Sequence, residues 1–108
     1  MLSKKNRVDK KGVDLVFKKG GLINSPTFSF KFILDSSYFS PRISFIVSKK
    51  ISKLAVRRNF LRRKGYLALE KHINKFPSGF LGVFVFKKAE ENVLKIENEI
   101  KEILNKIN

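Results

Sequence analysis

The chain has no cysteine and a single histidine, His72, among its 108 residues. The lack of cysteine excludes disulfides and thiolate metal sites, and nothing indicates an oxidising compartment. One histidine and scattered carboxylates cannot form a histidine-rich metal site. No apolar run approaches the roughly 18 residues that a membrane-spanning helix needs. Residues 1–7, a basic lead-in, are not followed by the apolar segment of a secretory signal, so we expect a cytoplasmic protein.

Catalytic patterns are also missing. A serine–histidine–carboxylate site would have to use His72, with only Glu70 nearby in the sequence. Gly20 and Gly21 lack the Gly-Lys-Ser/Thr continuation of a phosphate-binding P-loop and instead indicate the end of a helix. The glutamates near the C-terminus alternate with lysines, which is typical of a solvated helix face: Glu90, Glu91, Glu97, Glu99 and Glu102. We therefore expect no bond-breaking chemistry from the protein alone.

Positive charge dominates what is present. Lysine and arginine number 24 against 9 aspartates and glutamates, which gives a formal net charge of +15. The charge is concentrated, because residues 36–69 hold nine cations and no anion, whereas residues 87–108 hold five of each. Such a charge on a small chain favours binding to a polyanion. The hydrophobic content of 43% predicts a folded protein, and the length predicts one domain, residues 1–108.

The most basic segment, residues 47–66, is expected to contain a helix, because residues 54–70 have no proline and one glycine. Its cations are Lys49, Lys50, Lys53, Arg57, Arg58, Arg62, Arg63 and Lys64. On a helix, four polar residues share an arc of roughly 140°: Arg58, Asn59, Arg62 and Arg63. The apolar residues expected on the far side are Val56, Phe60, Leu61, Leu67 and Ala68. An arc without counter-charges indicates contact with phosphates.

Periodicity predicts the order helix, two or three strands, helix, strand, helix. The expected helices are 10–19, 54–73 and 90–107, and the expected strands are 22–25, 27–34, 42–47 and 80–86, with a turn at 35–41. Asp9 is the expected N-cap of the first helix, and Glu90 and Glu91 are expected in the first turn of the last. Helices against one sheet make an α+β or α/β sandwich. By the general rule, the crossover through the basic helix is right-handed.

The second expected strand separates two kinds of side chain. Phe28, Phe30, Phe32 and Leu34 alternate with Thr27, Ser29, Lys31 and Ile33. The phenylalanine face is expected to enter the core, and the opposite face, polar and basic, leaves room for a ligand. The strand at 80–86 is apolar on both faces, as is typical of a central strand.

At the basic helix the chain resembles the protein subunit of bacterial ribonuclease P. The family signature runs from S-x-K-K into A-V-x-R-N-R-x-K-R, and here the matching letters are V-S-K-K at 47–50 and A-V-R-R-N-F-L-R-R at 55–63. An upstream family element, R-L-x-K followed by F-x-x-V-F-x-x-G, is echoed by residues 7–8 and 13–20. The chain departs twice, because Phe60 stands where the family has arginine and Val13 stands where it has an aromatic residue. The resemblance covers essentially the whole chain.

The resemblance implies an α+β fold, an αβββαβα sandwich with a mixed four-stranded sheet and an unusual left-handed βαβ crossover. It also implies an endoribonuclease that removes the 5′ leader of precursor tRNA, in which the RNA subunit performs the hydrolysis with Mg²⁺. The implied partners are that RNA subunit, in a 1:1 complex with a monomeric protein, and precursor tRNA. No membrane is implied.

The resemblance further assigns residues. Those implied to bind the RNA subunit are Lys49, Lys50, Lys53, Arg57, Arg58, Asn59, Arg62 and Arg63. Those implied to bind the leader are Phe17, Lys18, Lys19, Ser29 and Lys31. Two other interpretations remain: a non-catalytic RNA-binding protein, such as a ribosomal protein, and a cationic protein of the membrane surface. The latter is less favoured because the basic helix has no broad apolar face.

Overall fold

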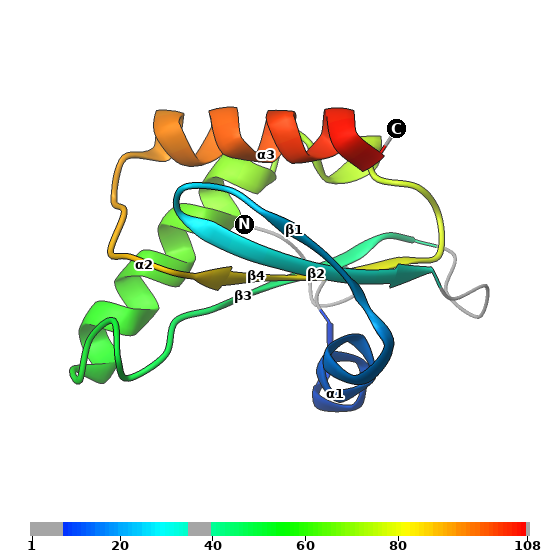
Figure 1. Cartoon of the computed structure of the whole chain (residues 1–108). Helices are drawn as coiled ribbons and strands as arrows, with labels where there is room; N and C mark the ends of the chain where they lie inside the picture. Colours follow the sequence, from blue (N-terminus) through cyan, green and yellow to red (C-terminus); the bar gives the residue numbers. More distant parts are fainter. Residues whose placement is uncertain (1–7, 35–39, 108) are drawn as a thin grey trace.

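The computed structural model describes residues 8–34 and 40–107 (Figure 1). The elements follow in the order α1 (Lys10–Lys19), β1 (Gly21–Asn24), β2 (Phe28–Leu34), β3 (Arg42–Ile46), α2 (Ala55–Leu69), the 3₁₀ turn η2 (Ile73–Lys75), β4 (Phe80–Phe86) and α3 (Val93–Ile107). The predicted order is confirmed. The expected lead-in at 1–7 and most of the turn expected at 35–41 lie outside the described residues. None of the helices described has both the length and the apolar character needed to cross a membrane.

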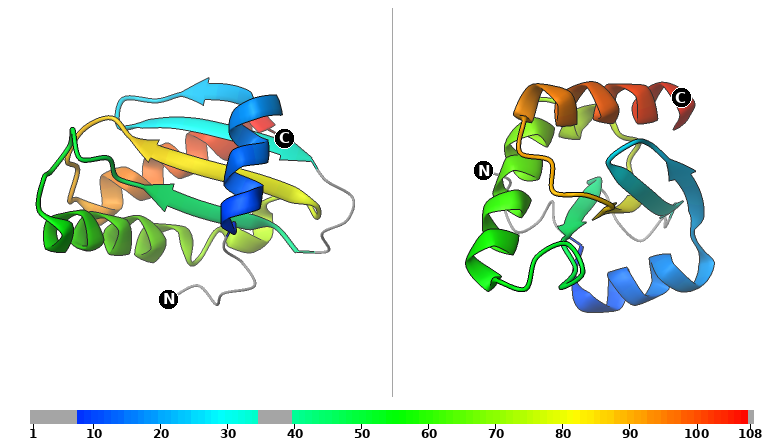
Figure 2. Two further views of the ribbon diagram at one scale, coloured as in Figure 1. Left: turned by 90° about the horizontal axis from the view of Figure 1, so that it is seen from below. Right: turned by 60° about the vertical axis from the view of Figure 1, so that its left-hand side comes forward.

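The four strands form one mixed sheet in the order β1-β2-β4-β3. The apolar strand β4 is central, antiparallel to β2 and parallel to β3. Two helices, α2 and α3, cover one face of the sheet, and α1 crosses the other (Figures 1 and 2). The predicted central place of β4 is therefore confirmed, and β1 is an edge strand, as expected.

Phenylalanine is the most frequent residue in the core between the sheet and the helix pair. Phe28, Phe30, Phe45 and Phe84 are buried, and the rings of Phe45 and Phe84 stack with centroids 4.9 Å apart. The helices contribute Leu61, Ala68, Leu69, Ile96, Ile100, Ile103 and Leu104. On the opposite face, a smaller cluster of Val16, Leu81 and Val83 lies under α1. The predicted core face of β2 ends early, because Leu34 is exposed and Phe32 is only half-buried.

The crossover from β3 through α2 to β4 is left-handed, so the general expectation of a right-handed connection is wrong (Figure 2). Side-chain alternation supplies the physical reason. Phe45 of β3 points to the same face as Phe28 and Phe84, and α2 must cover that apolar face. Because β4 lies between β2 and β3, the face that α2 covers decides the hand of the connection.

Two helix boundaries differ from the predicted ones, and the start of α1 agrees with its prediction. α2 ends at Leu69 instead of residue 73, because the chain then turns so that Ile73 and Phe76 both enter the core. α1 begins as predicted, with the Asp9 carboxylate accepting a hydrogen bond from the Gly12 amide. α3 begins later than predicted. The side chain of Asn92 accepts from the amides of residues 94 and 95, so the expected first-turn glutamates precede the helix.

The buried side of α2 also differs from the predicted one. Val56 and Leu67, expected on the apolar side, are 78% and 54% exposed. Gly65 instead lies against Phe45, and a Cβ atom on this glycine would stand 2.6 Å from the Phe45 Cδ1 atom. This close approach presses α2 onto β3 along the Leu61–Gly65 side. It therefore sets the rotation that leaves Val56 and Leu67 in solvent.

Candidate nucleic-acid interface

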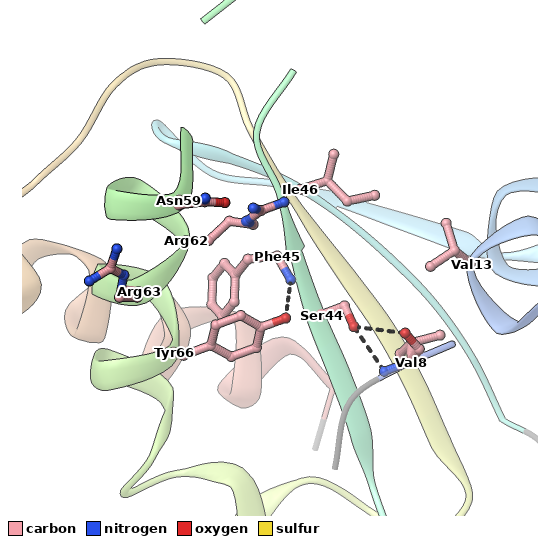
Figure 3. A pocket seen from close by; sticks show the side chains of 9 residues that line it. All are labelled: Val8, Val13, Ser44, Phe45, Ile46, Asn59, Arg62, Arg63 and Tyr66. Carbon is pink, nitrogen blue, oxygen red and sulfur yellow. Dashed lines mark hydrogen bonds between the residues drawn. The ribbon is translucent and has the colours of Figure 1, made fainter. Parts of the chain in front are cut away.

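A hollow of about 500 Å³ lies between the start of α1, β3 and α2 (Figure 3). We call it the α2 groove. Its lining residues are Val8, Val13, Ser44, Phe45, Ile46, Asn59, Arg62, Arg63 and Tyr66. The polar lining comes mainly from α2 and the apolar lining mainly from β3 and α1. The groove therefore has a cationic side and an apolar floor.

Hydrogen bonds tie the walls of the α2 groove to β3. The Val8 amide donates to the Ser44 hydroxyl at 2.8 Å, and that hydroxyl donates to the Val8 carbonyl at 3.2 Å. On the other side, the Phe45 amide donates to the Tyr66 hydroxyl at 3.3 Å, and the two rings meet edge to face. Both walls are thus anchored to the same strand, so the groove is pre-organised.

Three residues of the predicted arc line the groove. Asn59 and Arg62 extend toward Ile46, and Arg63 lies on the side of α2 that is turned away from Ile46 (Figure 3). Within residues 8–34 and 40–107, these three side chains make no hydrogen bond or ion pair, so their donors are free for a ligand. The cations are therefore presented without a counter-charge, as the sequence predicted.

Arg58, the fourth member of the arc, has a different place. Its guanidinium donates to the carbonyls of Ser52 and Lys53, both at 3.0 Å, and so holds the loop between β3 and α2 against the helix. That loop carries Lys49 and Lys50, which are exposed, as is Lys53 itself. Arg58 thus organises the basic loop, while its neighbours Asn59 and Arg62 line the groove.

Arg57 lies on the other side of α2. It forms an ion pair with Glu91, in the loop between β4 and α3, and its guanidinium lies 5.3 Å from the centroid of the Phe60 ring. Lys64 lies over the same ring at 5.0 Å. Among the cations that the resemblance assigns to the RNA subunit, Arg57 is the one that forms an ion pair within the described residues.

The residues assigned to the leader gather where α1 meets β2. The Lys31 ammonium lies 4.9 Å from the centroid of the Phe17 ring, and Phe17 is 40% exposed. Ser29 lies on the same face of β2 and donates to the Asn24 side chain at 3.1 Å. Lys18 and Lys19 end α1 and are exposed. The structure thus brings Phe17 and Lys31 together from segments that are apart in the sequence.

Some residues of functional interest carried no sequence signal. Ser44 and Tyr66 anchor the groove, but a serine in a strand and a tyrosine in a helix are unremarkable in sequence. Glu99 was expected on a solvated face. Instead its carboxylate accepts from the Thr27 amide at 2.8 Å, the Thr27 hydroxyl at 2.5 Å and the Ser25 hydroxyl at 2.6 Å. For Glu99 the expectation is wrong, because the turn between β1 and β2 meets α3.

One four-stranded mixed sheet, three helices and a cationic groove beside a left-handed crossover define a basic α+β protein with a surface suited to a polyanion. Residues 2–108 match the family model described as Ribonuclease P. The chain belongs to the ribonuclease P protein family.

Two relatives similar to this chain are ribonuclease P protein components. The chain is 29% identical over 109 residues to the ribonuclease P protein component of a Pseudanabaena species, covering 98% of this chain and 94% of the relative. It is 33% identical over 101 residues to that of a Nitratiruptor species, covering 85% and 88%.

Solved structures show the same fold. The ribonuclease P protein of Staphylococcus aureus matches with a TM-score of 0.80 at 19% identity, covering 95% of each chain. The protein of Thermotoga maritima matches with a TM-score of 0.79 at 24% identity, covering 94% of this chain and 97% of that one. The predicted αβββαβα fold is confirmed.

Proposed function

We propose that this chain is the protein subunit of a cytoplasmic ribonuclease P, which removes the 5′ leader of precursor tRNA. The protein binds the catalytic RNA subunit as a monomer, in a 1:1 complex, and the RNA carries out the hydrolysis. The observation that carries the proposal is the α2 groove. There, Asn59, Arg62 and Arg63 of the family motif stand unpaired within the described residues, on a helix anchored to the sheet.

The groove suits an RNA backbone for two reasons. Arginine guanidinium groups offer several donors in a fixed plane, which matches the paired oxygens of a phosphate. Asn59 adds a neutral donor and acceptor for a 2′-hydroxyl or a base edge. The exposed lysines of the loop before α2, Lys49, Lys50 and Lys53, extend the cationic surface. In this proposal Arg58 acts on the RNA through the loop that it holds, together with its own charge.

The precursor leader is assigned to the surface between α1 and β2. Phe17 offers an exposed ring on which an unpaired base can stack, and Lys31 over that ring supplies charge for the backbone. Lys18, Lys19 and Ser29 border this surface. The start of α1 borders the α2 groove and its end borders the leader surface, so one protein can contact the RNA subunit and the leader together.

The Mg²⁺ ions of the reaction are assigned to the RNA subunit. In the part of the chain that the structure describes, no three histidine, aspartate or glutamate side chains gather in a group that could hold a metal ion. The described residues therefore do not fit a protein-held ion, and the proposal gives the protein no step in metal chemistry. Its contribution is binding and positioning.

Reconstitution tests the proposal. The protein is mixed with a bacterial ribonuclease P RNA at low Mg²⁺, and leader removal from precursor tRNA is measured with and without the protein. Clear stimulation is expected. Tight RNA binding without stimulation would overturn the assignment and favour a non-catalytic RNA-binding protein.

The groove itself is tested by Arg62→Gln. We expect weaker binding to the RNA subunit and a plot of log Kd against log salt that is shallower by about one unit, because one phosphate contact is lost. Lys106→Gln removes the same charge from an exposed position on α3 and is the matched control. Equal effects of both substitutions would show that the groove does not contact the RNA subunit.

A further inference from the structure

α2 carries cations on two flanks. One flank faces the α2 groove with Asn59 and Arg62. The other, which we call the outer flank, consists of Arg57, Phe60 and Lys64. On this flank both cations lie over one aromatic ring, 5.3 Å and 5.0 Å from its centroid. These distances are within the range of cation–π attraction. The buried side of the helix separates the two flanks.

Phe60 gives the outer flank a fixed base. It is half-buried and packs against the main core, so its ring is held in place. Arg57 and Lys64 are long side chains whose free movement must be lost when they grip a ligand. A ring that already attracts both cations reduces this loss. At the position where the family pattern has one arginine, this chain thus has an aromatic residue that orders two flanking cations.

Glu91 occupies the outer flank by pairing with Arg57. A carboxylate and a phosphate accept hydrogen bonds from a guanidinium in the same way, so Glu91 stands where an RNA phosphate would stand. The side chains of the pair are 39% and 49% exposed. Ion pairs that are this exposed are weak and sensitive to salt, so a polyanion can displace the carboxylate.

We propose that the outer flank is a second phosphate-binding site of α2, and that Glu91 holds Arg57 until a phosphodiester of RNA displaces it. Lys64 provides the second cation for that phosphate. The inference rests on the proposed function, since it takes the RNA subunit as the ligand. It means that RNA contacts α2 from both flanks and that Glu91 competes with the RNA for one arginine.

A double-mutant cycle tests the competition. The Kd for ribonuclease P RNA is measured over a range of salt for the full chain and for Glu91→Gln, Arg57→Gln and the double variant. Glu91→Gln should bind about two- to fivefold tighter, the range expected when an exposed ion pair is removed. In the Arg57→Gln chain the same substitution should give no such gain. Glu102→Gln, at an exposed position of α3, controls for the change in net charge.

The role of the ring is tested separately. Phe60→Leu keeps the apolar packing but removes the π face, and it should weaken RNA binding about two- to threefold. Phe60→Tyr keeps the face and should retain the affinity. Unfolding midpoints measured by circular dichroism should match the parent for Glu91→Gln, which distinguishes a binding effect from a folding effect.

The outcomes separate this inference from the proposed function. If Glu91→Gln gains no more affinity than Glu102→Gln, or gains as much without Arg57, the outer flank is not a competed phosphate site. The proposed function survives that result when Arg62→Gln still weakens RNA binding. If the parent chain does not bind the RNA subunit, the proposed function and this inference both fall.

Discussion

Substituting Gly65 by alanine tests how closely α2 is set against the sheet. In an exposed helix this change stabilises by about 1 kcal/mol, because alanine loses less backbone freedom than glycine. Here the added Cβ would stand 2.6 Å, 2.8 Å and 2.9 Å from three atoms of the Phe45 ring. Contacts this short force either the ring or the helix to move, and overpacking of this kind costs roughly 1–3 kcal/mol.

The ring cannot move away easily. Phe45 is buried, stacks on Phe84 with centroids 4.9 Å apart, and meets Tyr66 at 5.1 Å. We therefore expect Gly65→Ala to lower the free energy of unfolding by about 1 kcal/mol after the helix gain is subtracted. In a chain of this size that lowers Tm by roughly 5 °C.

The matched experiment repeats the substitution in a Phe45→Leu chain, where the ring is gone. Urea unfolding followed by circular dichroism should show Gly65→Ala reversing its sign and becoming stabilising. If Gly65→Ala stabilises the parent chain, or has the same effect in both backgrounds, the close approach does not hold α2 in place.

The contacts of Glu99 and Phe17 each predict the effect of one substitution. Glu99→Ala should lower the free energy of unfolding, measured in urea, by about 2 kcal/mol, because it leaves the buried hydroxyl and amide of Thr27 without their charged acceptor. Glu102→Ala, on the exposed side of α3, should change the same free energy by less than about 0.5 kcal/mol. Equal losses for the two variants would contradict this role of Glu99. Phe17→Ala in the reconstituted enzyme should weaken precursor tRNA binding roughly tenfold, the loss of one stacked base, and leave mature tRNA binding unchanged. An equal loss of affinity for both tRNAs would show that the leader does not bind at Phe17 and Lys31.

Local patterns predicted most of the elements. The alternation in β2 and the apolar run of β4 can each be recognised from the residues of the strand alone. The Asp9 cap of α1 can likewise be recognised from neighbouring residues. The N-terminus of α3 was predicted too early because two glutamates suit a first turn, whereas the Asn92 side chain is the better cap.

The contacts that decide the site are between segments far apart in the chain. The rotation of α2 depends on Gly65 meeting Phe45, and sequence periodicity cannot detect that contact. Three of the four polar residues in the arc predicted for α2 nevertheless line the groove. Arg58 departs because nearby carbonyls of the preceding loop satisfy its guanidinium. The ion pair of Arg57 with Glu91 likewise joins residues that no local pattern connects.

The central position of β4 affects how the protein is made. β2 and β3 each pair with β4, which lies between them, so the sheet cannot close until residue 86 has been synthesised. The whole basic segment at 47–66 therefore leaves the ribosome before the surface that orients it exists. Pairing between such distant segments is slow because a long loop must close first. Until β4 pairs with β3, α2 has no complete sheet to pack against, so the groove that Asn59, Arg62 and Arg63 line can form only after the sheet has closed.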